Sequence, residues 1–241
     1  MNSPLAFAIL ALLATPRSPA QITLEFPGTP RTIPDGTLTG IAETHWLEGP
    51  EFESLRVREI EVFLQVAGGW NGDLYAQLSH NGVSSVLLNR AGVSSVDPFG
   101  YSDAGFSVTF AEAAPRGDIH WYRNVLAVEG VDLGEGPLTG TWAPDGRPFG
   151  PGLDPASQYR AATLNVFADL PLTGNWTLLL ADLSAGGQAQ WLGWGLRIES
   201  VPEPRECVLV SALGLLGAAL GHRRFRKRNV NVIAPDESRI P

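Results

Sequence analysis

The middle of the chain alternates apolar and polar residues with a period of two, the pattern of half-buried β-strands. The clearest run is residues 59–66, where aliphatic side chains at the even positions share one face and glutamate or glutamine stands at 59, 61 and 65. Shorter runs lie at 74–78, 106–110, 164–166, 176–180 and 192–198. Because short strands recur without an amphipathic helix of any length between them, we predict an all-β chain.

Turn residues separate these runs. Asn81-Gly82 supplies the pair with positive φ that two-residue hairpins favour, and Ile33 to Gly36 is a strong turn sequence. We interpret residues 22–50 as a lead-in with one edge strand and residues 143–156 as a long Pro/Gly loop. Leu55 and Val57 have the opposite parity to the strand that follows, so we expect a bulge near Arg58. The pattern predicts a β-sandwich over residues 21–200. We expect its core to include Trp176, Leu178, Trp194, Leu196 and Ile198.

The N-terminus has the order of a signal peptide. Residues 5–14 form a short apolar run, and small residues follow at Ser18 and Ala20. This run is too short to span a bilayer comfortably, so we predict a signal peptide over residues 1–20, cleaved after Ala20. The alternative is a buried N-terminal strand or helix.

The C-terminus carries a second apolar run. Residues 207–221 contain no charge and would form a helix about 22 Å long. We predict a single transmembrane helix here, although it is shorter than the roughly 30 Å hydrocarbon core unless flanking arginines snorkel or the bilayer thins. A basic cluster follows it directly, made of Arg223, Arg224, Arg226, Lys227 and Arg228. By the positive-inside rule this cluster would stay in the cytoplasm and leave the folded domain outside.

The motif Val201-Pro202-Glu203-Pro204 stands immediately before that apolar run. Motif, apolar span and basic cluster together resemble the PEP-CTERM sorting signal of Gram-negative bacteria. The resemblance implies transient insertion of residues 201–228 in the inner membrane, removal by an exosortase-type membrane peptidase, and delivery to the cell surface or extracellular matrix. The polar extension 229–241 departs from the family pattern, and a simple single-pass anchor is the alternative.

The charge distribution argues against nucleic acid as a partner. Residues 21–201 contain nine Arg, no Lys and 21 Asp or Glu, so the central part of the chain would repel a phosphate backbone. The only cysteine, Cys207, lies in the apolar tail, so no intrachain disulfide can form. Stability must come from the burial of a core.

Two segments of the central part share a further resemblance. The first contains Gly72-Asp73-Leu74 and Leu87-Leu88, and the second contains Gly174-Asn175-Trp176-Thr177-Leu178, Asp182 and Trp194-Gly195-Leu196-Arg197-Ile198. Over residues 37–200 the chain resembles the P domain, the jelly-roll β-sandwich that follows the catalytic domain in kexin and subtilisin-like proprotein convertases. The resemblance implies a jelly-roll fold and a stabilising role without catalysis.

Candidate catalytic groups are sparse. His45, His80 and His120 have no metal-ligand spacing, and we expect each to be a loop or surface residue. The serine pairs at 84–85 and 94–95 lack the G-x-S-x-G elbow. We therefore predict that the chain is not an enzyme.

Calcium is a candidate ligand. Asp97, Asp103 and Asp118 lie in turn-rich segments, and loop carboxylates are oxygen ligands of the kind that Ca²⁺ prefers. The alternative is that these acidic loops are simply solvated.

Exposed aromatic side chains would suit a sugar. Trp46, Trp70, Trp121 and Trp142 lie outside the strongest alternating runs and could form a binding platform, although packing at the ends of the sandwich is the preferred interpretation. The main functional expectation is a non-catalytic surface or matrix module. The alternatives are a carbohydrate-binding module for extracellular polysaccharide and a stabilising partner of a separate subtilase.

Overall fold

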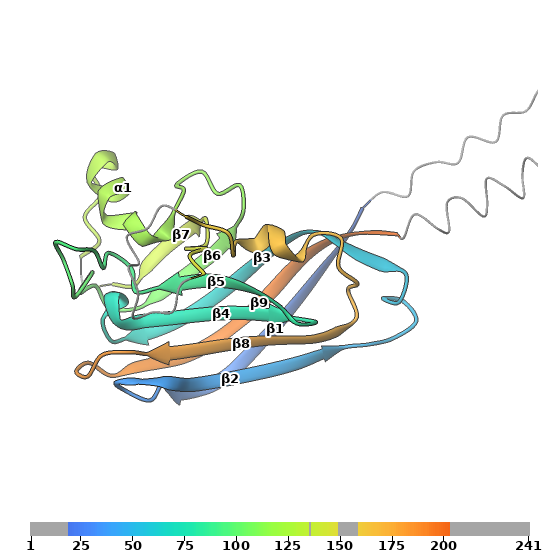
Figure 1. Ribbon diagram of the computed structural model, residues 1–241, viewed down its shortest axis with the longest axis horizontal. Coiled ribbons are helices and arrows are strands. Elements are labelled where there is room, and N and C mark those ends of the chain that lie inside the picture. The colour runs from blue at the N-terminus through green and yellow to red at the C-terminus, as the bar shows by residue number, and fades with distance from the viewer. Residues whose placement is uncertain (1–18, 135, 149–158, 203–241) are drawn as a thin grey trace, which may run out of the picture. The chain divides into compact units, whose positions relative to one another are not determined.

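Two β-sheets packed face to face make up the part of the chain that the structure describes (Figure 1). This computed structural model describes residues 19–134, 136–148 and 159–202. The strands are β1 (Ala20–Thr32), β2 (Thr37–Leu47), β3 (Leu55–Gly68), β4 (Leu74–His80), β5 (Val83–Asn89), β6 (Phe106–Ala111), β7 (Leu138–Trp142), β8 (Gly174–Asp182) and β9 (Ala189–Pro202). The helices are the 3-10 turns η1 (Asn71–Asp73), η2 (Ile119–Trp121) and η3 (Leu164–Phe167), and the α-helix α1 (Tyr122–Glu129).

The strands follow a regular order. One sheet has five strands in the order β1-β9-β3-β6-β7, and the other has four in the order β2-β8-β4-β5. β7 joins β6 in parallel, whereas β1 with β9, β2 with β8, β3 with β6, and β4 with both β5 and β8 pair antiparallel. If β7 is left out and the remaining strands are renumbered in chain order, β8 becomes strand 7 and β9 becomes strand 8. The two sheets then have the strand orders 1-8-3-6 and 2-7-4-5. The prediction of an all-β sandwich is confirmed.

The core lies between the two sheets. Every second residue of β3, β4 and β8 points inward, as the period-two pattern requires, and the inward residues are buried. The residues that the sequence predicted for the core are all buried, namely Trp176, Leu178, Trp194, Leu196 and Ile198. Each such aliphatic side chain contributes about 1.5–3 kcal/mol of burial free energy, which holds the sheets together without a disulfide.

The strand β3 contains the irregularity predicted near Arg58. The strand is continuous, but Arg58 and Glu59 are both exposed while Val57 and Ile60 on either side are buried. The inward face therefore changes parity at this point.

Three local predictions are wrong. Residues 22–50 form two strands, β1 and β2, where one edge strand was predicted. The first strand was missed because Pro and Thr residues obscure the inward alternation at 22, 24 and 26. Residues 164–166 belong to η3, whose buried Leu164 and Phe167 have the spacing of a 3-10 turn. The helix α1 was not foreseen; it buries Tyr122 and Leu126 and ends at Gly130 with φ 69°. Residues 144–148, in the described part of the predicted Pro/Gly loop, form neither helix nor strand, as expected, but most of them are buried.

The predicted targeting segments fall almost entirely outside the described residues. This applies to residues 1–18 of the signal peptide, to the apolar run 207–221 with its basic cluster, and to the extension 229–241. Of the sorting motif, Val201 and Pro202 lie at the end of β9, and Glu203 and Pro204 lie outside. Within the described part of the chain, no helix has the length and apolar character needed to cross a membrane.

Candidate ligand-binding groove

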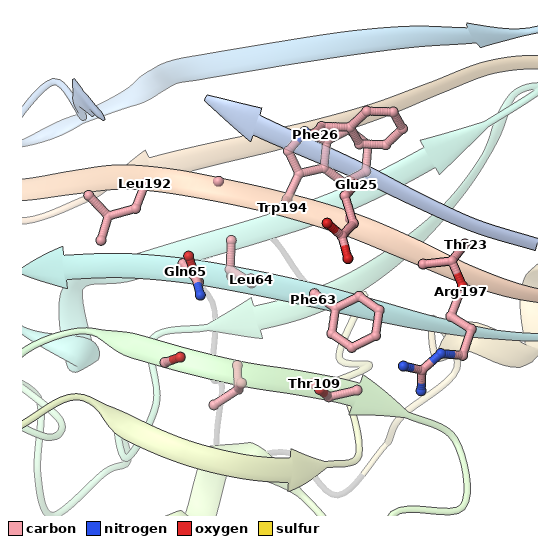
Figure 2. Close-up of a pocket in the computed structure, with 14 residues that line it drawn as sticks. Thr23, Glu25, Phe26, Phe63, Leu64, Gln65, Thr109, Leu192, Trp194 and Arg197 are labelled. Carbon is pink, nitrogen blue, oxygen red and sulfur yellow. The ribbon is translucent and has the colours of Figure 1, made fainter. Parts of the chain in front are cut away.

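An open groove of about 420 Å³ crosses the outer face of the five-stranded sheet (Figure 2). Its walls come from four neighbouring strands: β1, β9, β3 and β6. The outward residues of these strands are Thr23 and Glu25, Gly193, Gly195 and Arg197, Phe63 and Gln65, and Ser107 and Thr109. Volumes of 300–1,000 Å³ are typical of small-molecule sites.

Strand register brings these residues together. Glu25 lies opposite Gly195 and Thr23 opposite Arg197 in the pairing of β1 with β9. Phe63 lies opposite Thr109 and Gln65 opposite Ser107 in the pairing of β3 with β6. Since side chains alternate along each strand, the residues between them, such as Leu64 and Trp194, point into the core.

Two glycines of β9 explain why this part of the sheet is hollow. Gly193 and Gly195 occupy outward positions, so β9 carries no side chain into the groove at these two points. A Cβ atom at Gly195 would lie 2.7 Å from the carbonyl oxygen of Leu24, so β1 also approaches β9 more closely than a larger residue would allow. The groove is thus a consequence of glycine at two alternate positions.

The polar side of the groove centres on Arg197. Its guanidinium donates to Glu61 at 2.7 Å and lies 4.9 Å from the centre of the Phe63 ring. This arrangement holds the half-buried Phe63 ring between a cation and the glycine floor. The outward side chains of the groove therefore combine one aromatic ring, one paired cation, and hydroxyl, amide and carboxylate groups.

A second hollow of about 290 Å³ continues along the same face. It shares Arg197 with the first and is lined by Gln21, Glu59, Glu61 and Glu199. Glu199, which lines it, forms an ion pair with Arg58 at 3.1 Å. Together the two hollows form an elongated path over β9 and β3.

Two of the three described histidines are buried, and the third, His45, stacks on the groove-lining Phe26 with ring centres 3.7 Å apart. His80 stacks on Trp176 with ring centres 3.8 Å apart, and His120 lies 2.8 Å from Asp145 with both side chains fully buried. The prediction of loop or surface positions for these two is wrong, because their polar atoms are satisfied inside the sandwich by carbonyls and a carboxylate. His45 is half-buried and contacts Glu43 at 2.6 Å.

The three aspartates predicted to bind calcium do not share a site. The carboxylate of Asp97 accepts from the backbone amides of residues 99 and 100 and so caps its own turn. Asp103 accepts two hydrogen bonds from Arg123 and one from Tyr122. Burial opposes ionisation of Asp103, but these donors outweigh burial and lower its pKa. Within the described ranges no three His, Cys, Asp or Glu side chains are grouped so that they could hold a metal ion.

Asp118 belongs to a buried ion network. Its carboxylate accepts from Arg147 at 2.8 Å and from the backbone amide of His120 at 3.0 Å. Arg147 also donates to the buried Asp145 at 3.0 Å. This carboxylate is therefore engaged in holding η2 and the segment after β7 together.

The four tryptophans proposed as a platform are dispersed. Trp142 is 0% exposed and donates to Thr139, so its assignment to a platform is wrong: pairing of β7 with β6 turns its ring into the core. Trp121 is half-buried. Trp46 and Trp70 are 70% and 43% exposed. Trp46 pairs with Asn175 at the start of β8, whereas Trp70 precedes η1, which lies beside the end of β8, so the two side chains are at opposite ends of that strand.

Sequence reasoning missed the groove residues, although one signal was present. Phe63 is an aromatic residue in a register that is otherwise polar, at 59, 61 and 65, and such a position predicts an exposed aromatic side chain. Thr23, Thr109 and the glycines of β9 gave no signal, because only strand pairing brings them beside Phe63.

Comparisons with known proteins add little to this picture. No protein-family model matches the chain, and no curated protein is detectably similar to it. A chain of the crystal structure of the complex between Aeromonas sobria serine protease and the chaperone ORF2 aligns with 77% of this chain, at 14% identity and a TM-score of 0.39. The alignment spans 28% of that chain's length. The functional assignment therefore rests on the groove itself.

Proposed function

We propose that the chain is a non-catalytic binding module that holds a neutral polysaccharide in the groove on its five-stranded sheet. The observation that carries the proposal is the groove's composition: outward polar side chains on four strands, one outward aromatic ring, and a floor of two glycines. A sugar offers hydroxyl groups that need donors and acceptors at close spacing, and apolar C–H faces that pack on aromatic rings.

The open shape favours a polymer over a small molecule. The groove lies on a sheet face and continues into the hollow beyond Arg197, so a chain of sugar units can enter along the strands without having to be enclosed. The glutamates along the path, including Glu25, Glu59 and Glu199, would repel an acidic polymer. A neutral polysaccharide therefore fits best.

The proposal extends to family and location. The strand order 1-8-3-6 opposite 2-7-4-5, with β7 added at one edge, supports the jelly-roll classification that the P-domain resemblance implies. The PEP-CTERM-like tail over residues 201–228 supports export, passage through the inner membrane, and release to the cell surface or matrix by an exosortase-type peptidase. A polysaccharide ligand suits a protein placed there.

Affinity electrophoresis of the purified chain in gels that contain neutral polysaccharides tests the function. Phe63→Ala should weaken binding about tenfold, since an aromatic contact contributes roughly 0.5–1.5 kcal/mol in addition to the free energy of burying its surface. Phe99→Ala removes a ring that is 69% exposed on a loop remote from the groove, and it should bind like the unaltered chain. Equal affinity of the two variants would place the ligand elsewhere.

A further inference from the structure

A buried carboxylate without a donor stands at the end of β8. Asp182 is 1% exposed, and among the described residues neither of its side-chain oxygens has a partner at hydrogen-bond geometry. The backbone of Ser184 is close enough to favour its ionised form, but it makes no such bond. Asp182 has the same parity as Trp176, Leu178 and Leu180, so its side chain points inward with the core residues of β8.

Two further carboxylates lie beside it. Asp182 pairs with Leu74 in the sheet, and the amide of Leu183 donates to the carbonyl oxygen of Asp73 at 2.9 Å, which places Asp73 next to Asp182. Asp73 is itself 5% exposed. Asp35, in the turn between β1 and β2, is near enough to act electrostatically on both. Burial, Asp73 and Asp35 together raise the pKa of Asp182 to about 6.

The charges around this cluster leave Asp182 uncompensated. Arg90 favours ionisation of Asp73, but its guanidinium donates to the carbonyls of Gly72 and Pro98 and has no resolved effect on Asp182. Asp35 is held by the amide of Gly186 at 3.1 Å. A buried carboxylate that lacks donors is costly, and a bound cation removes that cost.

We propose that Asp73 and Asp182 form a calcium site at this end of the sandwich. Calcium accepts carboxylate, backbone carbonyl and water oxygens in flexible geometry, so two carboxylates suffice when the neighbouring turns and solvent supply the rest. The donor set contains only oxygen, which disfavours zinc and other metals that prefer nitrogen or sulfur. No third metal-binding side chain completes the group within the described residues, so backbone and water oxygens are part of the proposal.

The site would tie two connections together, and a hydrogen bond joins a third to them. Asp73 lies in η1 between β3 and β4, and Asp182 ends β8. Asp35, bonded to Gly186, brings the turn between β1 and β2 against the loop between β8 and β9. Calcium would thus clamp one end of the sandwich. This inference does not depend on the proposed polysaccharide function, because the groove uses none of these residues.

Calcium titration of the purified full chain at pH 7.5 tests the site. The melting temperature in 5 mM CaCl₂ should be roughly 5–10 °C higher than in EDTA, because a ligand that binds only the folded state stabilises it. Terbium luminescence excited through tryptophan should appear on addition of Tb³⁺ and decrease when Ca²⁺ competes, since Trp70 lies directly before η1.

Matched variants locate the site. Asp182→Asn should abolish both responses while unfolding in EDTA at no lower temperature than the unaltered chain, because it removes a buried charge. Asp73→Asn should abolish them as well, and it serves if Asp182→Asn does not fold. Asp97→Asn, which can keep the turn, should retain both. An unaltered chain that shows no calcium shift, or a response that Asp97→Asn loses and Asp182→Asn keeps, would overturn the proposal.

Discussion

How readily a carboxyl group of this protein ionises depends on its burial, on the hydrogen-bond donors around it and on neighbouring charges. Asp103 has three side-chain donors and ionises more readily than an ordinary aspartate, whereas Asp182 has none and ionises less readily. Burial raises the pKa of both carboxyl groups. At Asp103 the donors outweigh burial, whereas at Asp182 the carboxylates of Asp73 and Asp35 add to it. Sequence could identify both as acidic residues but could not say which one was paired.

Asp103→Asn should lower the free energy of unfolding by about 1–3 kcal/mol at pH 7, because Arg123 and Tyr122 lose a charged acceptor. Since the pKa of Asp103 is lowered on folding, its contribution is complete above the unfolded value of 3.8 and is lost as pH falls below it. Urea unfolding at pH 7 and pH 3 measures the change.

The control for this measurement is Asp169→Asn. Asp169 is exposed and has φ 62°, a conformation that asparagine also tolerates. Its variant should match the unaltered chain at both pH values. A deficit in Asp103→Asn that is equally large at pH 3 would contradict the role given to its charge.

At the scale of single elements, β8 carries the core of the four-stranded sheet. It lies between β2 and β4, and its Trp176 packs on His80 and Phe167. The edge strand β2 has an exposed outer face, on which Trp46 is 70% exposed. The two tryptophans lie on neighbouring strands, yet Trp176 is buried and Trp46 is exposed.

Trp176→Ala should cost about 3–5 kcal/mol of stability, the range for removing a buried aromatic side chain. Trp46→Ala should change stability by less than about 0.5 kcal/mol, as surface substitutions do. Chemical denaturation of both variants gives the comparison. Similar losses in the two would mean that the inward face of β8 is assigned wrongly.

The end of α1 depends on one glycine. Gly130 has φ 69°, and a Cβ atom there would meet no other atom within 4 Å, so an alanine would introduce backbone strain without a clash. Gly130→Ala should destabilise the protein by about 1 kcal/mol. Gly136, equally open but without a positive φ, should tolerate alanine. Indistinguishable melting temperatures for the two variants would contradict the assignment of Gly130 as the helix cap.

At the scale of the whole molecule, the sequence predicted the class of fold well and the site poorly. Alternation in β3, β8 and β9 identified the inward residues, because burial on one face imposes a period of two. The partners of each strand were not accessible from alternation. The groove exists only because β1, β9, β3 and β6 lie side by side, so Thr23 and Thr109 could not be recognised as neighbours.

The sorting proposal also belongs to this scale. In a host with an exosortase, an antibody against the folded domain should detect a released form that lacks an epitope tag placed at Pro241. A tag after Ile198 would be unsuitable, because β9 continues to Pro202. Replacing Pro202, Glu203 and Pro204 with alanine should retain the protein in the inner membrane. Release of that triple variant at the normal rate would refute the sorting role.

The groove over β9 and β3 is the binding surface that we propose. Amide chemical shifts of the ¹⁵N-labelled chain, recorded during titration with oligosaccharides of a polysaccharide that binds, locate the ligand residue by residue. Shifts should concentrate at outward residues of the five-stranded sheet, namely Thr23, Phe63, Gln65, Thr109 and Arg197. Shifts confined to the four-stranded sheet around Trp46 would contradict binding in the groove.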